Sequence, residues 1–358
     1  MRPLRLALVV SVLTLLSIGL VMLYSHSMWT GESFFWKQVM WLLPASAAAV
    51  FAYLAGPRFL TRYYIPWIVY AVALALLLAV LVPGVGTKVN GARRWLFGLQ
   101  PSELAKLALV LVLAHYASAR QGRMEDRETG FTFPVLMAGV LCLLVFLEPD
   151  WGTAIIMAIV SAGLLLVAGT RYSYLVVTTV IAGEFLFSIL CNNLVRLHRF
   201  FAFLDPQRYA DSYAWQPWHV MLALGRGFVT GTGVGDGSFK MGFISEQHTD
   251  FILSLVGEEF GFVGTSLVLL AFITLVICGM NIAWRAPDPF SQLLAVGLTL
   301  LLGVQAFVNI GVATSSLPNK GTTLPFISYG GSSLVCCFAC IGLLLGIEAR
   351  SGRANSKE

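Results

Sequence analysis

Long apolar stretches separated by short polar segments dominate this chain. Runs of the roughly 20 apolar residues that a helix needs to cross a bilayer occur about ten times along its 358 residues. Their approximate positions are 6–24, 34–55, 63–83, 102–118, 131–148, 152–169, 173–191, 251–279, 291–313 and 328–348. No repeat with a period of about 20–50 residues is visible. The pattern predicts an all-α polytopic membrane protein, with about ten transmembrane helices in a single domain, 1–358.

The polar segments between these runs predict the orientation. Lys and Arg recur in the short segments on the side of the N-terminus, which favours a cytoplasmic N-terminus and a cytoplasmic tail at about 349–358. The large loop between the seventh and eighth spans, 192–250, is then exterior, as are 84–101 and 314–327. These exterior loops also carry cations, which suit an anionic ligand bound at the membrane. Ordinary solvated loop charges are the alternative.

Composition supports this interpretation. Hydrophobic residues make up 58% of the chain and charged residues 11%, whereas a soluble domain carries about 25% charged residues. The net charge of +5 is scattered along the loops, which argues against nucleic-acid binding. The six cysteines lie in or beside apolar runs, so buried, inert thiols are expected. The apolar segment after the basic N-terminus lacks a convincing cleavage site, and it is interpreted as an uncleaved first span.

The stretch "NGARRWLFGLQPSELAK", 90–106, leads from an exterior loop into the fourth span. Its Pro-Ser-Glu sequence is a helix-start signal. Glu103 and Lys106 lie three residues apart on one helical face, so they can pair. Such a pair just inside the membrane is typical of a polar cavity, although a structural pair is the alternative. Arg93 and Arg94 suit a phosphate group at the interface.

Two other loops carry polar or glycine-rich motifs. In "EPDWGTA", 148–154, Asp150 and Thr153 are interpreted as a cap of the sixth helix rather than as catalytic groups. "GTGVGDGSFK", 231–240, resembles a phosphate-binding loop only superficially, because it follows no strand. Its glycines are expected to allow a close-packed turn near a substrate.

The most informative acids lie in "SEQHTDFILSLVGEEFGFVG", 245–264. Asp250, next to His248, stands at the exterior start of the eighth span, where it either caps the helix or acts as a general base. Glu258 and Glu259 fall inside the span, where a carboxylate is costly. We interpret both glutamates as polar packing within the bundle.

The segment "LPNKGTTLPFISYGGSSL", 317–334, contains Lys320, Ser328 and several Gly and Pro residues before the tenth span. Irregular backbone at membrane depth is tolerated only against protein or a water-filled cavity. The segment is therefore expected to line a cavity. These residues by themselves leave three classes open: an ion-coupled transporter, a lipid flippase, or a glycosyltransferase acting on a lipid-linked sugar pyrophosphate.

Five motifs in this order, "NGARRW…QPSELAK", "PDWGT", "GTGVGDGSFK", "SEQHTDFILSLVGEEFGFVG" and "LPNKGTTLPFISYGGSS", resemble the SEDS family (shape, elongation, division and sporulation) over essentially the whole chain. Lys320 and the "GEE" at 257–259 resemble the division branch more than the elongation branch. Glu148 and Trp151 depart from the family pattern, which usually has Gln and Leu there.

The resemblance implies a peptidoglycan glycosyltransferase that polymerises lipid II at the outer face of the bacterial cytoplasmic membrane, for septal synthesis. It also implies a class B penicillin-binding protein, a transpeptidase, as partner, together with other divisome membrane proteins. Asp250 matches the family's essential aspartate and is assigned as general base. The expected substrate-binding residues are Arg93, Arg94, Glu103, Lys106, Arg199, Lys240, His248, Lys320 and Ser328. A divalent cation, Mg²⁺ or Mn²⁺, is compatible with a pyrophosphate, but nothing in the sequence establishes one. The alternatives are a lipid II flippase and an elongation-type polymerase.

Overall fold

The computed structural model describes residues 3–61, 64–89, 92–192, 194–239, 247–319 and 321–354. Almost every element in these residues is a helix. In chain order the elements are α1 (Pro3–Thr30), α2 (Phe34–Leu60), α3 (Ile65–Leu81), β1 (Thr87–Val89), β2 (Ala92–Trp95), α4 (Pro101–Ser118), a 3₁₀ turn (Gln121–Arg123), a π turn (Arg127–Thr132), α5 (Phe133–Leu147), α6 (Trp151–Val167), α7 (Tyr172–Cys191), α8 (Leu194–Leu204), α9 (Trp215–Arg226), α10 (Ile252–Trp284), α11 (Pro289–Ala313) and α12 (Gly331–Ala354).

Each predicted apolar stretch coincides with one of these helices. Within the described residues, seven helices are long and apolar enough to cross a membrane, while α3 and α6 are apolar but shorter. The buried Glu103 and Lys106 lower the hydropathy of α4, which packs inside the bundle. A helical, multi-pass membrane fold is therefore confirmed, and the count of ten spans stays a prediction. α12 runs to Ala354, so the predicted C-terminal tail begins as helix.

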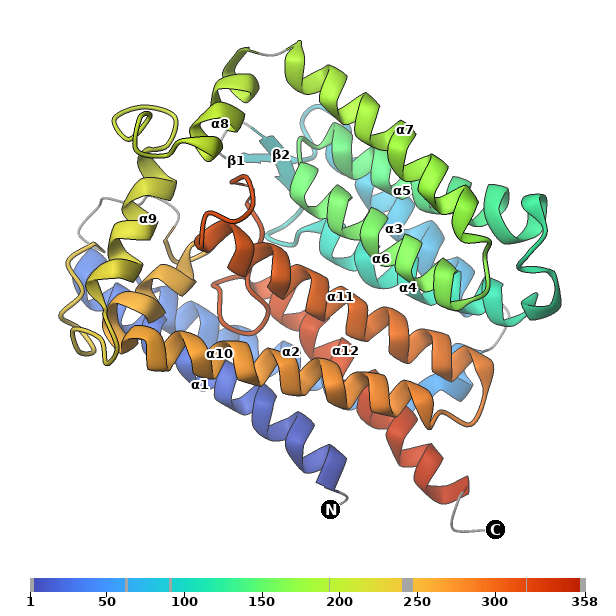
Figure 1. Ribbon diagram of the computed structural model, residues 1–358. Helices are drawn as coiled ribbons and strands as arrows, with labels where there is room; N and C mark the ends of the chain where they lie inside the picture. The colour runs from blue at the N-terminus through green and yellow to red at the C-terminus, as the bar shows by residue number, and fades with distance from the viewer. Residues whose placement is uncertain are drawn as a thin grey trace.

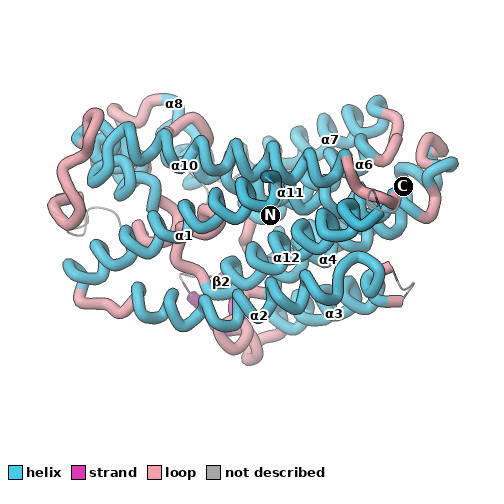
Figure 2. The backbone as a smooth tube through the Cα atoms, turned by 90° about the horizontal axis from the view of Figure 1, so that it is seen from below, coloured by secondary structure: helices cyan, strands magenta, loops and turns pink. Residues whose placement is uncertain are grey.

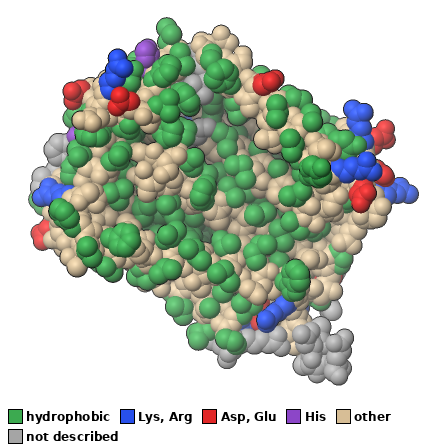
Figure 3. All heavy atoms as spheres, viewed as in Figure 1, with side chains coloured by type: hydrophobic (Ala, Val, Ile, Leu, Met, Phe, Trp, Pro, Cys, Tyr) green, Lys and Arg blue, Asp and Glu red, His purple; other side chains and the backbone are tan. Residues whose placement is uncertain are grey.

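The two termini lie at the same end of the bundle, and α8, α9 and the β1–β2 hairpin lie toward the opposite end (Figure 1). Charged side chains gather toward two edges of the molecule, and a broad apolar surface lies between them (Figure 3). This distribution is what a bilayer requires of a spanning protein, because exposed apolar side chains face lipid in the middle.

The centre of the bundle is formed by α4, α11 and α12. Nearly every side chain of α4 is buried, and α4 packs against α3, α6 and α11. α12 packs mainly on α2 and also contacts α4 and α11 (Figure 2). A helix that is apolar on all faces belongs in such a position, because each face has a neighbouring helix to pack against.

The segment 192–250 is not an unstructured loop. It contains α8 and α9, whose side chains are apolar on one face and polar on the other, as expected for helices lying at an interface. β1 and β2 form a small antiparallel hairpin that the sequence did not predict. α7 is almost entirely exposed and makes few contacts with α6 and α8.

Candidate functional site

Asp250 lies in a turn that precedes α10, the helix against which α9 packs. The N-cap position of α10 is occupied by Phe251, whose side chain makes no capping hydrogen bond, and Asp250 precedes this position by one residue. The backbone oxygen of Asp250 accepts a hydrogen bond from Nδ2 of Asn309 at 2.9 Å. A Cβ atom added to Gly321 would lie 2.8 Å from Oδ2 of Asp250, so the Gly321 backbone lies directly against the Asp250 carboxyl group. Asp250 itself is partly exposed.

The segment 321–330 is held against the Asp250 turn by its own backbone and by Ser328. The Ser328 hydroxyl accepts from the Leu324 amide at 2.8 Å and donates to the Thr249 oxygen at 2.5 Å. The Tyr329 amide donates to the His248 oxygen at 2.9 Å. Ser328 is buried, so in this structure it positions the turn next to Asp250.

A series of buried, hydrogen-bonded polar side chains connects α4 to the segment 321–330. Nζ of Lys106 lies 2.9 Å from Oε1 of Glu103 and 2.8 Å from Oε1 of Gln305 on α11. Nε2 of Gln305 donates to the oxygen of Thr323 at 2.9 Å. Glu103 and Lys106 therefore connect α4 with α11 and, through Gln305, with the segment 321–330. Because every partner is hydrogen-bonded, the buried charges are tolerated.

His248 lies in an aromatic cluster beside Asp250. Its ring stacks on Phe34 with centroids 4.1 Å apart, and it also contacts His26 and Tyr329. Burial lowers the pKa of His248 below its usual value, which favours the neutral imidazole. Gln38 of α2 completes this region, since its amide donates to the oxygen of Ser328 at 3.2 Å.

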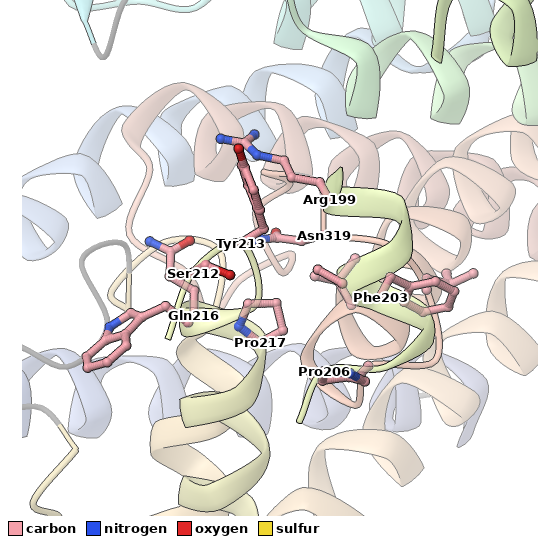
Figure 4. Close-up of a pocket in the computed structure, with 13 residues that line it drawn as sticks. Arg199, Phe203, Pro206, Ser212, Tyr213, Gln216, Pro217 and Asn319 are labelled. Carbon is pink, nitrogen blue, oxygen red and sulfur yellow. The ribbon is translucent and has the colours of Figure 1, made fainter. Parts of the chain in front are cut away.

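The predicted cations that the structure describes have different surroundings. Arg94 donates to the backbone oxygens of Glu148 and Pro149 in the α5–α6 turn, and Arg93 is exposed on β2. Arg199 of α8 lines a separate cavity (Figure 4). Lys240 and Lys320 fall outside the described residues, so their predicted roles stay predictions.

The α5–α6 turn contains a confirmed helix cap and an unusual acid. Oδ1 of Asp150 accepts from the Thr153 amide at 3.2 Å, as the sequence predicted for a cap of α6. Both carboxyl oxygens of Glu148 are buried without a hydrogen-bond partner. Burial, together with the charge of Asp150, raises the pKa of Glu148 to about 8. The carboxyl group of Glu148 is therefore mostly protonated at pH values below about 8.

Glu258 and Glu259 bind the glycine-rich segment, as the polar-packing interpretation predicted. Oε1 of Glu258 accepts from the Ser238 amide at 2.7 Å. Glu259 accepts from the Ser25 hydroxyl at 2.7 Å and from the Gly235 amide at 3.1 Å. Both glutamates are fully buried.

Three amide side chains, Gln38, Gln305 and Asn309, organise the site and were missed at the level of sequence. Each lies within an apolar stretch, which is the signal that would identify it, because a polar side chain at membrane depth needs a partner. Among the residues that the structure describes, no group of three His, Cys, Asp or Glu side chains is arranged to hold a metal.

Comparison with known proteins shows the family of this chain. The cell cycle protein family model that covers FtsW, RodA and SpoVE matches residues 6–352. A Geobacter metallireducens protein named probable peptidoglycan glycosyltransferase FtsW is 38% identical over 343 residues, covering 93% of this chain and 91% of the relative. A protein of the same name from Trichlorobacter lovleyi is 36% identical over 364 residues, covering 97% and 95%.

Solved structures show the same fold. A chain of a peptidoglycan synthase complex described as coordinating polymerization and crosslinking superposes with a TM-score of 0.79 at 28% identity, over 96% of this chain and 97% of that one. The rod shape determining protein RodA of Thermus thermophilus gives a TM-score of 0.71 at 29% identity, over 96% and 95%. The chain therefore belongs to the family of FtsW, RodA and SpoVE, which is the SEDS family.

Proposed function

We propose that this protein is a peptidoglycan glycosyltransferase that polymerises lipid II at the outer face of the bacterial cytoplasmic membrane, as part of septal wall synthesis. The observation that carries the proposal is the position of Asp250. Its carboxyl group is partly exposed, while its backbone is fixed by Asn309 and its side chain lies against Gly321. The names of the FtsW relatives support the same reaction and the division role.

In the proposed reaction, Asp250 takes the proton from the 4-hydroxyl of the acceptor N-acetylglucosamine. The hydroxyl oxygen attacks the anomeric carbon of the donor N-acetylmuramic acid, and the bond from that carbon to the lipid pyrophosphate breaks. The configuration inverts from α to β, and undecaprenyl pyrophosphate leaves. General-base catalysis of this kind contributes about 10²- to 10⁴-fold.

The leaving pyrophosphate gains negative charge, which fixed cations stabilise. Lys320 precedes Gly321 in the chain, so it is the first candidate for this role; Arg93, Arg94 and Lys240 are the others. We include Mg²⁺ or Mn²⁺ as a counter-ion that arrives with the pyrophosphate. Its test is the loss of activity with a chelator and its recovery with either metal.

The proposal places both termini in the cytoplasm and the α8–α9 end outside, at the division septum. It also assigns a class B penicillin-binding protein as partner, because a relative in a peptidoglycan synthase complex shares this fold. Other divisome membrane proteins are expected to associate with the pair.

A polymerisation assay tests the proposal. Purified protein with its transpeptidase partner is incubated with lipid II, and glycan strands are separated on a gel. We expect strands from the wild type and none from Asp250→Asn, with Lys320→Ala strongly reduced. A flippase would instead move lipid II across liposome membranes, make no strands, and tolerate Asp250→Asn if the ligand still bound. Failure of the wild type to make strands with its partner would overturn the proposal.

A further inference from the structure

A cavity lined by α8, α9 and the segment after α11 has no role in the reaction described so far. Its volume is about 290 Å³, and it lies between α8, the start of α9 and the segment that follows α11. This volume is at the lower end of the range for small-molecule sites, roughly 300–1,000 Å³. The cavity therefore suits a group the size of one sugar ring rather than a whole lipid-linked disaccharide peptide.

The position of the cavity relative to Asp250 follows from α11. Asn309, which holds the Asp250 backbone, is three residues before Val312, which lines the cavity. Residues three apart lie on the same helical face, about 4.5 Å apart along the axis. Asn319 also lines the cavity, two positions before the Gly321 that touches Asp250. In the proposed orientation, the Val312 side of the cavity is therefore further out along α11 than Asn309.

The lining combines aromatic rings with neutral hydrogen-bonding groups. Figure 4 shows the Arg199 guanidinium and the Tyr213 hydroxyl at one rim, with Phe203 on one wall and Gln216 on the facing wall. The Tyr213 ring is held by stacking on His198, with centroids 5.2 Å apart. Rings of this kind offer flat apolar faces and polar tips.

The polar groups favour a neutral sugar over a pyrophosphate. The amides of Gln216 and Asn319 each present a donor and an acceptor, which complement the N–H and C=O of an acetamido group. A pyrophosphate offers acceptors only and is bound best by several cations, whereas Arg199 is the single charged side chain among the described residues that line the cavity.

We propose that this cavity binds one N-acetylhexosamine ring of the donor glycan, the ring outward from the bond being formed. The inference rests on the proposed glycosyltransferase function and deepens it. The sugar ring stacks against Phe203 and Tyr213, and its acetamido group forms hydrogen bonds with Gln216 and Asn319. The site therefore orients the donor so that its anomeric carbon faces the hydroxyl that Asp250 deprotonates.

Steady-state polymerisation of lipid II by the full chain with its partner tests this inference. We expect Gln216→Ala and Asn319→Ala each to raise KM roughly 3- to 10-fold with kcat nearly unchanged, because each removes one hydrogen bond made equally in ground and transition states. Gln207→Ala is the matched control, since Gln207 is exposed on the same connection and does not line the cavity. Its KM should equal that of the wild type.

A second measurement reads binding without turnover. Saturation-transfer NMR with the soluble disaccharide N,N′-diacetylchitobiose should show contact with the wild type and a weaker signal with Gln216→Ala. Unchanged KM and unchanged disaccharide signal in both cavity variants would overturn the inference while leaving the polymerase intact. If the variants instead lost co-purified phospholipid in native mass spectrometry with KM unaffected, the cavity would be a lipid site and the inference would also fail. A wild type without polymerase activity would identify the proposed function as the error.

Discussion

Acidic side chains at two neighbouring places in the molecule have opposite surroundings. Glu258 and Glu259, within α10, are fully buried, and their oxygens accept hydrogen bonds from the chain's own backbone and from Ser25. Asp250, just before α10, is partly exposed, and its backbone oxygen accepts a hydrogen bond from Asn309. Carboxylates that are fully buried and accept hydrogen bonds from internal donors serve the fold. A partly exposed carboxylate can also be reached by a substrate from outside the protein.

The largest effect should come from Asp250→Asn. We expect glycan synthesis to fall by about 10²- to 10⁴-fold, because the amide cannot accept the proton. The midpoint of thermal unfolding should stay close to that of the wild type, since the Asn309 contact involves the Asp250 backbone. Initial rates with lipid II and unfolding in detergent check both parts. Asp211→Asn, an exposed acid of the same connection, serves as the control. Near-normal glycan synthesis by Asp250→Asn would show that Asp250, like Glu258 and Glu259, does not act in the reaction.

Glu258→Ala should show the reverse pattern, with a loss of stability rather than a specific loss of chemistry. The substitution leaves the half-buried amides of Ser238 and Phe239 without their acceptor. We expect the free energy of unfolding to fall by about 2 kcal/mol, which is the lower limit for two orphaned donors, because water can reach half-buried amides. Chemical unfolding in detergent measures it, with the exposed Glu128→Ala as control. A fully stable but inactive Glu258→Ala protein would instead place this glutamate in the reaction.

Gly261→Ala tests the packing between α10 and the glycine-rich segment. Gly261 has φ +65° and ψ −156°, a region that is essentially restricted to glycine, and a Cβ there would lie 2.4 Å from the Gly231 nitrogen. We expect a loss of about 1–3 kcal/mol, measured by unfolding. Gly139→Ala is the control, because nothing lies within 4 Å of an added Cβ and alanine favours the helix. Gly261 interrupts the helical backbone of α10. Equal stability of the two variants would show that this interruption is not required for folding.

The smallest effect on activity is expected at Glu148. Its carboxyl oxygens are buried and have no hydrogen-bond donor. Its pKa is raised in the folded protein from its ordinary value near 4.5 to about 8. The folded state therefore keeps a proton that the unfolded state releases, and stability falls as pH rises through this interval. Glu148→Gln cannot titrate, so its unfolding midpoint should vary less with pH and should exceed that of the wild type above pH 8. Parallel pH profiles for the two proteins would contradict this.

The sequence by itself determined the class of the protein, because apolar stretches of bilayer length can satisfy their backbone groups only as helices. It also identified the family, the cap at Asp150 and the packing role of Glu258 and Glu259, since each depends on local spacing or on the cost of a charge in the membrane. It could not find Gln38, Gln305 and Asn309 as organisers of the site, because their partners are remote in the chain.

The tertiary structure alone decided how the site is assembled. It gave Arg94 and Arg199, both expected to bind substrate, different surroundings: Arg94 donates to the α5–α6 turn, and Arg199 lines the cavity beside α8. It placed Phe251, and not Asp250, at the N-cap of α10, and it brought Gly321 against the Asp250 carboxylate. Side-chain contacts of this kind depend on how helices pack and where loops fold back, and those are properties of the whole bundle rather than of any one segment.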